Sequence, residues 1–113
     1  MKKFKDQCAQ GDMLITRVES MPHNVERCKP EDNGDHIVTH SETGHHHVVD
    51  SATVNFFQAA NDDLVSFLEV VKPTPIRHLR EAHTHEEIML DPGIYRVNRQ
   101  REWTPERLRM VMD

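Results

Sequence analysis

The sequence has few glycines and cysteines and no long apolar run, and each shortage excludes a class of protein. Its four glycines do not fall in the spacing of a phosphate-binding loop or a dinucleotide-binding turn, so we expect no nucleotide cofactor. No serine stands in the glycine-framed elbow of a hydrolase nucleophile. Cys8 and Cys28 have the spacing of neither a redox pair nor a zinc knuckle, which predicts free thiols in a reducing compartment.

No stretch approaches the roughly 18 consecutive apolar residues that span a membrane. The basic start, MKKFKDQ, leads into polar residues where a signal peptide needs an apolar stretch, so we expect a cytoplasmic protein with no membrane partner. The formal net charge of −5 argues against nucleic acid as the main partner, because phosphate binding draws on an excess of clustered Lys and Arg.

Length and composition predict a single domain over residues 1–113. A chain of 113 residues buries one modest core. Because only 36% of the residues are apolar, self-association is a second source of burial, and a homo-oligomer is one expected state. The seven basic residues of 73–113 are all arginines, whose forks pair with carboxylates or phosphates. That half either faces a partner or forms a solvated, internally paired surface.

The first half of the chain has the pattern of strands separated by one long loop. Residues 12–18, DMLITRV, are rich in β-preferring side chains and predict a strand that is apolar on both faces. Residues 19–35 hold two prolines and a glycine among many charges and predict a long polar loop. Residues 36–40 and 45–50, HIVTH and HHHVVD, flank a four-residue connection and predict a hairpin.

The second half predicts more strands. Residues 53–71 contain two β-rich runs around the polar NDD, which indicates a hairpin; the second run is read as a strand because it is β-branched and two prolines follow it. Residues 76–80 predict a short strand. Residues 86–90 and 94–102 flank DPG, the pattern of two strands joined by a tight turn.

The end of the chain predicts a short helix over residues 104–113. Thr104 is a suitable N-cap, and Pro105 fits the first helical position. The helix would pack one apolar stripe on the sheet, formed by Leu108, Val111 and Met112. The expected fold is therefore all-β and mostly antiparallel, a small barrel or sandwich with a short C-terminal helix.

Three consecutive histidines, His45, His46 and His47, fall at the start of a predicted strand. Side chains two apart on a strand share a face, so His45 and His47 project together, roughly 6.5 to 7 Å apart at their roots. Two imidazoles at that spacing can converge on one divalent ion such as Zn²⁺, Fe²⁺, Mn²⁺ or Ni²⁺. The alternative is a set of exposed polar side chains beside a turn.

A second cluster, HTHEE, begins at His83. In an extended segment His83, His85 and Glu87 share a face, whereas a bulge would bring in Glu86 instead. The carboxylate would be a further ligand or a general base on metal-bound water. The alternative is a hydrogen-bonded acidic cluster that only raises histidine basicity. The recurrence of His-x-His in one small domain favours a shared metal site, formed by His45, His47, His83, His85 and Glu87.

These motifs resemble two groups of proteins. The paired His-x-His elements, the carboxylate and the PG-x-Y-x-V strand at 92–97 resemble cupins, which implies a metal-binding β-barrel. Arg77 stands where the cupin motif has a glycine, and no histidine follows His85. The segments QGDMLITRV, SETGHHH and HTHEEIMLDPGIYRVNRQREWTP are similar to a small group of uncharacterised bacterial and phage-associated proteins. That resemblance implies that the segments act together and implies no chemistry.

Three functions remain open at this point. The first is a module that binds a divalent metal for structure or sensing, or titrates as a proton switch. The second is a structural or oligomeric interaction subunit without metal, which uses sheet edges and the Arg-rich strand. The third is a cupin-like, metal-dependent enzyme acting on a small molecule. The residues alone identify no catalytic group.

Overall fold

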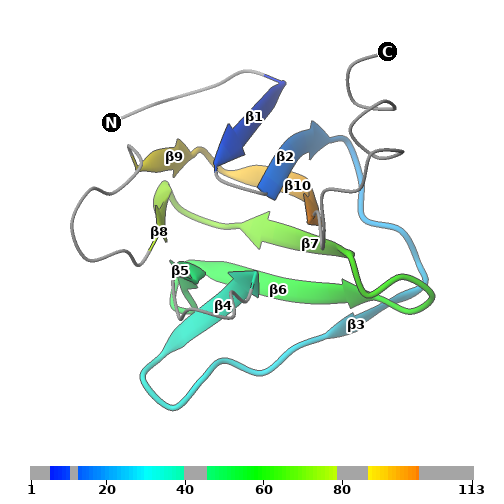
Figure 1. Ribbon diagram of the computed structural model, residues 1–113, viewed down its shortest axis with the longest axis horizontal. Coiled ribbons are helices and arrows are strands. Elements are labelled where there is room, and N and C mark those ends of the chain that lie inside the picture. The colour runs from blue at the N-terminus through cyan, green and yellow to red at the C-terminus, as the bar shows by residue number, and fades with distance from the viewer. Residues whose placement is uncertain (1–5, 11–12, 40–45, 79–86, 100–113) are drawn as a thin grey trace, which may run out of the picture.

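The computed structural model describes residues 6–10, 13–39, 46–78 and 87–99, which form two antiparallel β-sheets (Figure 1). The described ranges contain no helix, and hence none long and apolar enough to cross a membrane. The strands are β1 (Gln7–Gln10), β2 (Met13–Val18), β3 (Val25–Arg27), β4 (Asp35–Thr39), β5 (His47–Asp50), β6 (Val54–Ala59), β7 (Val65–Val70), β8 (Thr74–His78), β9 (Ile88–Leu90) and β10 (Gly93–Arg99).

The larger sheet has six strands in the order β1-β2-β10-β7-β6-β3. The predicted hairpin over 53–71 is confirmed as β6 and β7, with Phe57 opposite Phe67. Asp62 holds its turn, because its carboxylate accepts a hydrogen bond from Leu64 N at 2.9 Å. The Arg-rich strand β10 is paired on both sides, so its backbone presents no free edge.

The smaller sheet has four strands in the order β4-β5-β8-β9. The predicted hairpin of 36–40 with 45–50 is confirmed as β4 and β5, with a register shift between Ile37 and Thr39. This shift is a bulge-like irregularity at the end of β4. The short predicted strand near 76–80 begins earlier than expected, at Thr74.

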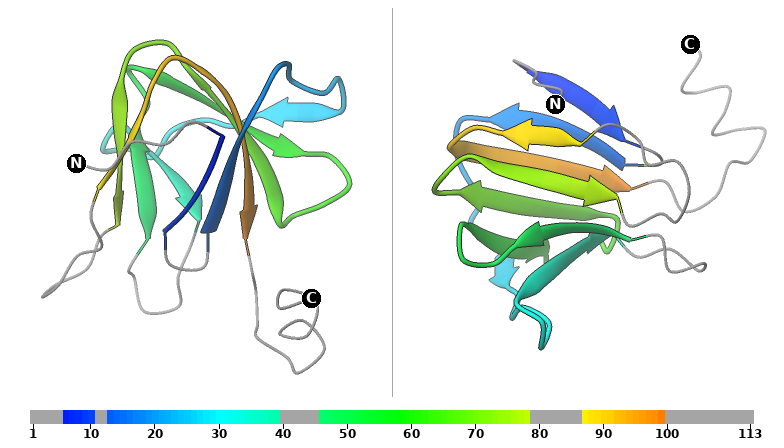
Figure 2. Two further views of the ribbon diagram at one scale, coloured as in Figure 1. Left: turned by 90° about the horizontal axis from the view of Figure 1, so that it is seen from above. Right: turned by 90° about the vertical axis from the view of Figure 1, so that its left-hand side faces the viewer.

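The two strands predicted around DPG are present as β9 and β10, joined by a short connection, but they do not pair with each other. Leu90 ends β9 in the four-stranded sheet, and Gly93 begins β10 in the six-stranded sheet, so the turn carries the chain from one sheet to the other. The segments 28–34, 51–53 and 71–73 make the same kind of crossing. The crossings at 51–53, 71–73 and 91–92 lie at one end of the molecule, which we call the crossover end (Figure 2).

The core lies between the two sheets and draws on both of them. From the four-stranded sheet come Val38, Val49, Ile76, Ile88 and Leu90. From the six-stranded sheet come Cys8, Met13, Ile15, Val54, Phe56, Leu68, Val70, Tyr95 and Val97. The fold is therefore an antiparallel two-sheet arrangement, and over the described residues the sheets do not close into a barrel.

Two other sequence expectations concern the loops and the end of the chain. The long polar loop predicted over 19–35 contains β3, a three-residue edge strand that pairs with β6. The pattern missed it because so short a strand carries little periodicity. The helix predicted over 104–113 lies outside the described residues.

Candidate functional site

The strand register brings the ends of two histidine-bearing connections together. His47 at the start of β5 lies directly opposite His78 at the end of β8. Ile76, two residues before His78, lies opposite Ile88 of β9. The connection from β4 to β5 and the connection from β8 to β9 therefore start and finish at the same end of the four-stranded sheet. We call this the histidine end, and its described members are Thr39, His47, His78 and Glu87.

His47 lies on the interior face of the four-stranded sheet. Its side chain is 2% exposed, and it stands two residues before Val49, which belongs to the core. Strand alternation therefore gives both residues the same face. A histidine in this position can offer one ring nitrogen to an ion while the other donates a hydrogen bond.

Glu87 precedes β9 directly and is half-buried. Ile88, the next residue, is buried in the core. Alternation along a regular strand places Glu87 on the face opposite to Ile88, and so opposite to the interior face that holds His47. These two predicted ligands therefore lie at the same end of the sheet but on different faces.

The remaining predicted ligands, His45, His83 and His85, lie outside the described residues, as does Glu86. Within the described ranges, no three side chains of His, Cys, Asp or Glu gather closely enough to hold a metal ion. The candidate centre therefore consists of one buried imidazole and the ends of the two connections that carry the other histidines.

Part of the interior near the histidine end is polar. Thr39, His47 and Ser66 are all buried there, on strands β4, β5 and β7. Thr39 and Ser66 also line a hollow of 190 Å³ between the two sheets, together with Arg99 at the end of β10. Buried hydroxyls and imidazoles require hydrogen-bonding partners, so their concentration here marks a part of the core suited to a polar occupant.

His36 is a second buried histidine of the four-stranded sheet. It is 4% exposed, and its ring lies 5.6 Å from that of Phe56 on the opposite sheet. Burial lowers the pKa of His36, and a hydrogen bond with the Val54 backbone opposes this effect. Its Nδ1 atom is buried without a hydrogen-bond partner. His36 lies two residues before the core residue Val38, so strand alternation in the sequence indicates that both side chains share a face.

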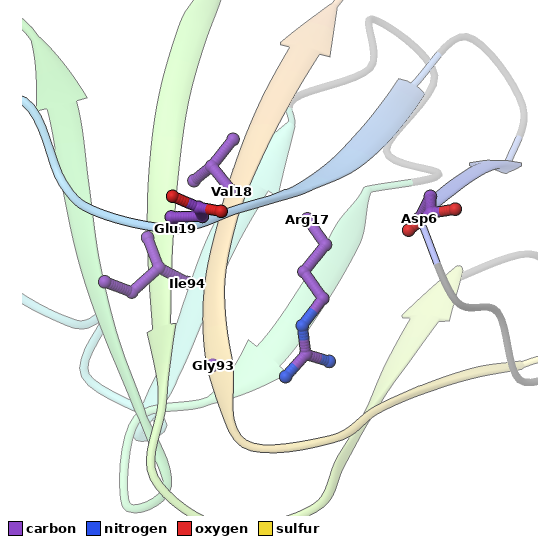
Figure 3. A pocket seen from close by; sticks show the side chains of 6 residues that line it. All are labelled: Asp6, Arg17, Val18, Glu19, Gly93 and Ile94. Atoms are coloured by element: carbon purple, nitrogen blue, oxygen red, sulfur yellow. The ribbon is translucent and has the colours of Figure 1, made fainter.

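A hollow of 580 Å³ lies at the crossover end, at the opposite end of the strands from His47 (Figure 3). The side chain of Arg17 extends into it from β2. Arg17 Nη1 donates to the Tyr95 hydroxyl at 3.2 Å, and Nη2 donates to the Pro92 carbonyl at 2.9 Å. The guanidinium also lies 5.5 Å from the centre of the Tyr95 ring. These contacts commit Arg17 to holding the start of β10, which is a structural role.

The two cysteines are free thiols, as the sequence predicted. Cys8 is buried in the core on β1, whereas Cys28 is partly buried and packs against the core from the end of β3. Burial raises the pKa of the Cys28 thiol. The raised pKa keeps the Cys28 thiol protonated, and a protonated thiol is a weak nucleophile.

Comparisons with known proteins give a family. A search of curated proteins and a search of solved structures each found no match to the chain. A family model described as a domain of unknown function, DUF8820, matches residues 9–100. This match covers both sheets and the two histidine-bearing connections, and it accords with the expected likeness to a group of uncharacterised proteins. The chain therefore belongs to the DUF8820 family.

Proposed function

We propose that the protein binds one divalent transition metal ion at the histidine end. The observation that supports this is the register of β5, β8 and β9, because it gives two sequence clusters, forty residues apart, a common end of one sheet. Imidazole and carboxylate ligands suit Zn²⁺, Fe²⁺, Mn²⁺ and Ni²⁺. The proposed ligands are His45, His47, His83 and His85, with one carboxylate from Glu87 or Glu86.

The spacing of the strands fits ligands from both connections. Neighbouring strands are about 4.8 Å apart, so β5 and β9, with β8 between them, are separated by about 10 Å. Each ligand nitrogen lies about 2.1 Å from the ion, and each imidazole reaches well beyond its own strand. An ion bound by both clusters therefore takes its ligands from both sides of β8.

The proposed role of the ion is structural or sensing. His47 belongs to the buried interior, so a change in metal occupancy acts directly on the packing beneath the four-stranded sheet. An ion that also takes ligands from the second connection ties the two connections together. Because it binds the folded chain and not the unfolded one, it stabilises the fold by mass action.

The choice of carboxylate is a separate question with its own experiment. A regular extended segment groups Glu87 with His83 and His85 on one face, whereas a bulge brings in Glu86 instead. Glu86→Gln and Glu87→Gln are matched changes that each remove one charge and keep the size of the side chain. Only the variant that loses a ligand should bind the ion more weakly.

Metal content of the untagged protein tests the proposal. After incubation with Zn²⁺, Fe²⁺, Mn²⁺ or Ni²⁺ and removal of free ion, we expect about one ion per chain for at least one metal. His85→Ala should weaken binding on the order of 100-fold, since it removes a ligand without disturbing the described core. His23→Ala is the control, because His23 is exposed on the segment between β2 and β3. A chain that retains none of these metals ends the proposal.

A further inference from the structure

The hollow between the two sheets lies at the histidine end. Its walls come from β6, the last residues of β4 and β10, the first residues of β7 and the turn before β7. Phe56 and Val97 supply apolar surface, and Thr39, Ser66 and Arg99 supply polar groups. The hollow is therefore a partly enclosed space with an apolar side and a polar side.

The polar lining offers mostly hydrogen-bond donors. The hydroxyl-bearing residues Thr39 and Ser66 belong to opposite sheets and are buried. Arg99 is half-buried, and its backbone N–H is already used by the carbonyl of Leu64 at 2.9 Å. Gln58 is committed elsewhere, because its Nε2 donates to the carbonyls of Asp62 and Val65, each at 2.9 Å. Among the lining residues that the structure describes, Arg99 carries the positive charge.

Asp63 also lines the hollow and is the acidic group that would oppose an anion. It is exposed, so water screens its charge, and it already takes part in another interaction. Arg99 is half-buried, so water screens its guanidinium less than it screens the Asp63 carboxylate. The balance at the inner wall therefore favours a negatively charged occupant.

We infer that this hollow binds a small organic carboxylate. Its 190 Å³ are below the roughly 300–1,000 Å³ of sites for drug-sized molecules, so the ligand has only a few carbon atoms. Arg99 would take the carboxylate through its planar fork, the geometry that guanidinium groups match best. The hydroxyls of Thr39 and Ser66 would bond the remaining oxygens, and the carbon chain would lie against Phe56 and Val97. That this carboxylate is the co-ligand or substrate of the metal rests on the proposed function.

Titration of the ¹⁵N-labelled full chain tests the inference. The probes are acetate, propionate and butyrate, each compared with the amide of the same carbon skeleton at constant ionic strength. We expect the carboxylates to shift the backbone signals of Thr39, Ser66 and Arg99 saturably, and the amides to leave them in place. Arg99→Gln should weaken carboxylate binding at least tenfold. Arg96→Gln is the matched control, because it removes the same charge from an exposed position on the opposite face of β10.

The outcomes separate this inference from the metal proposal. Ser66→Ala provides a second test if Arg99→Gln does not fold, and it should weaken binding severalfold. Equal binding of acids and amides, no saturation, or equal losses in the two arginine variants would overturn the carboxylate site. Each titration is run with and without the metal that the chain retains. Carboxylate binding to a chain that retains no metal removes only the metal proposal, and metal retention without carboxylate binding removes only this inference.

Discussion

The guanidinium of Arg17 fills the space beside Gly93. A Cβ built on Gly93 would lie 2.8 Å from Arg17 Nη2, and the φ of Gly93 is 154°. Gly93 opens β10 directly after the crossing from the four-stranded sheet, so the contact fixes the point where the chain changes sheets. A side chain here would meet a steric clash and an unfavourable backbone conformation together.

Gly93→Ala should therefore destabilise the protein by about 2–4 kcal/mol, from backbone strain and the displacement of Arg17. The matched comparison is Gly34→Ala. Gly34 also has a positive φ, 87°, but no atom within 4 Å of the added Cβ. Gly34→Ala should therefore lower the free energy of unfolding by only about 1–2 kcal/mol. Urea unfolding of both variants measures the difference, and equal losses would contradict the role of Arg17.

The Tyr95 hydroxyl joins β10 to two neighbours. It donates to the carbonyl of Asp91 at 2.6 Å and accepts a hydrogen bond from Arg17. Tyr95→Phe keeps the buried ring and removes both bonds, so we expect a loss of about 1–3 kcal/mol. Burial also raises the pKa of Tyr95. Absorbance titration should accordingly show the phenol ionising above its ordinary pKa of about 10, and only after unfolding if the hydroxyl is held as described.

His36 makes stability depend on pH. Its pKa in the folded state is lowered by burial, so the unfolded chain takes up a proton at a higher pH than the folded chain does. The contribution is fully present above about pH 6.5, the ordinary value, and is lost as pH falls toward the lowered pKa. Urea unfolding at a series of pH values should show stability decreasing through this window.

The control for this pH effect uses two histidines. His36→Phe removes the titrating group and should flatten the dependence below pH 6.5. His23→Phe changes an exposed histidine and should leave the dependence as it was. If both variants keep the full dependence, the source is another group and the role assigned to His36 fails.

The sequence predicted local structure well where one segment contained the whole signal. The β6–β7 hairpin follows from β-branched runs around a polar turn, closed by Pro73, and all of that information is local. The turn at Asp91–Gly93 was also predicted, but its strands join different sheets. A turn motif sets the direction of the chain at one point. The motif does not determine which strands the two flanking segments pair with, because that pairing depends on contacts between residues distant in sequence.

The candidate site shows the same division. Strand alternation predicted that the side chains of His45 and His47 lie on the same face. The structure adds that His47 faces the core together with Val49. The relation of Glu87 to His47 depends on which residue of β9 faces inward, and the burial of Ile88 decides it. The sequence could not set that parity, because Ile88, Met89 and Leu90 are all apolar and the pattern does not show which of them face the core.

The central claim is that one ion takes ligands from both connections at the histidine end, and paramagnetic broadening by Mn²⁺ tests it most directly. Added below one equivalent to the ¹⁵N-labelled chain, Mn²⁺ should broaden the amide signals of Thr39 and Val48 beside the first connection and of Ile88 beside the second. Val54 and Gly93 at the crossover end should keep their intensity. Broadening beside only one connection, or spread over the acidic surface, would contradict the claim.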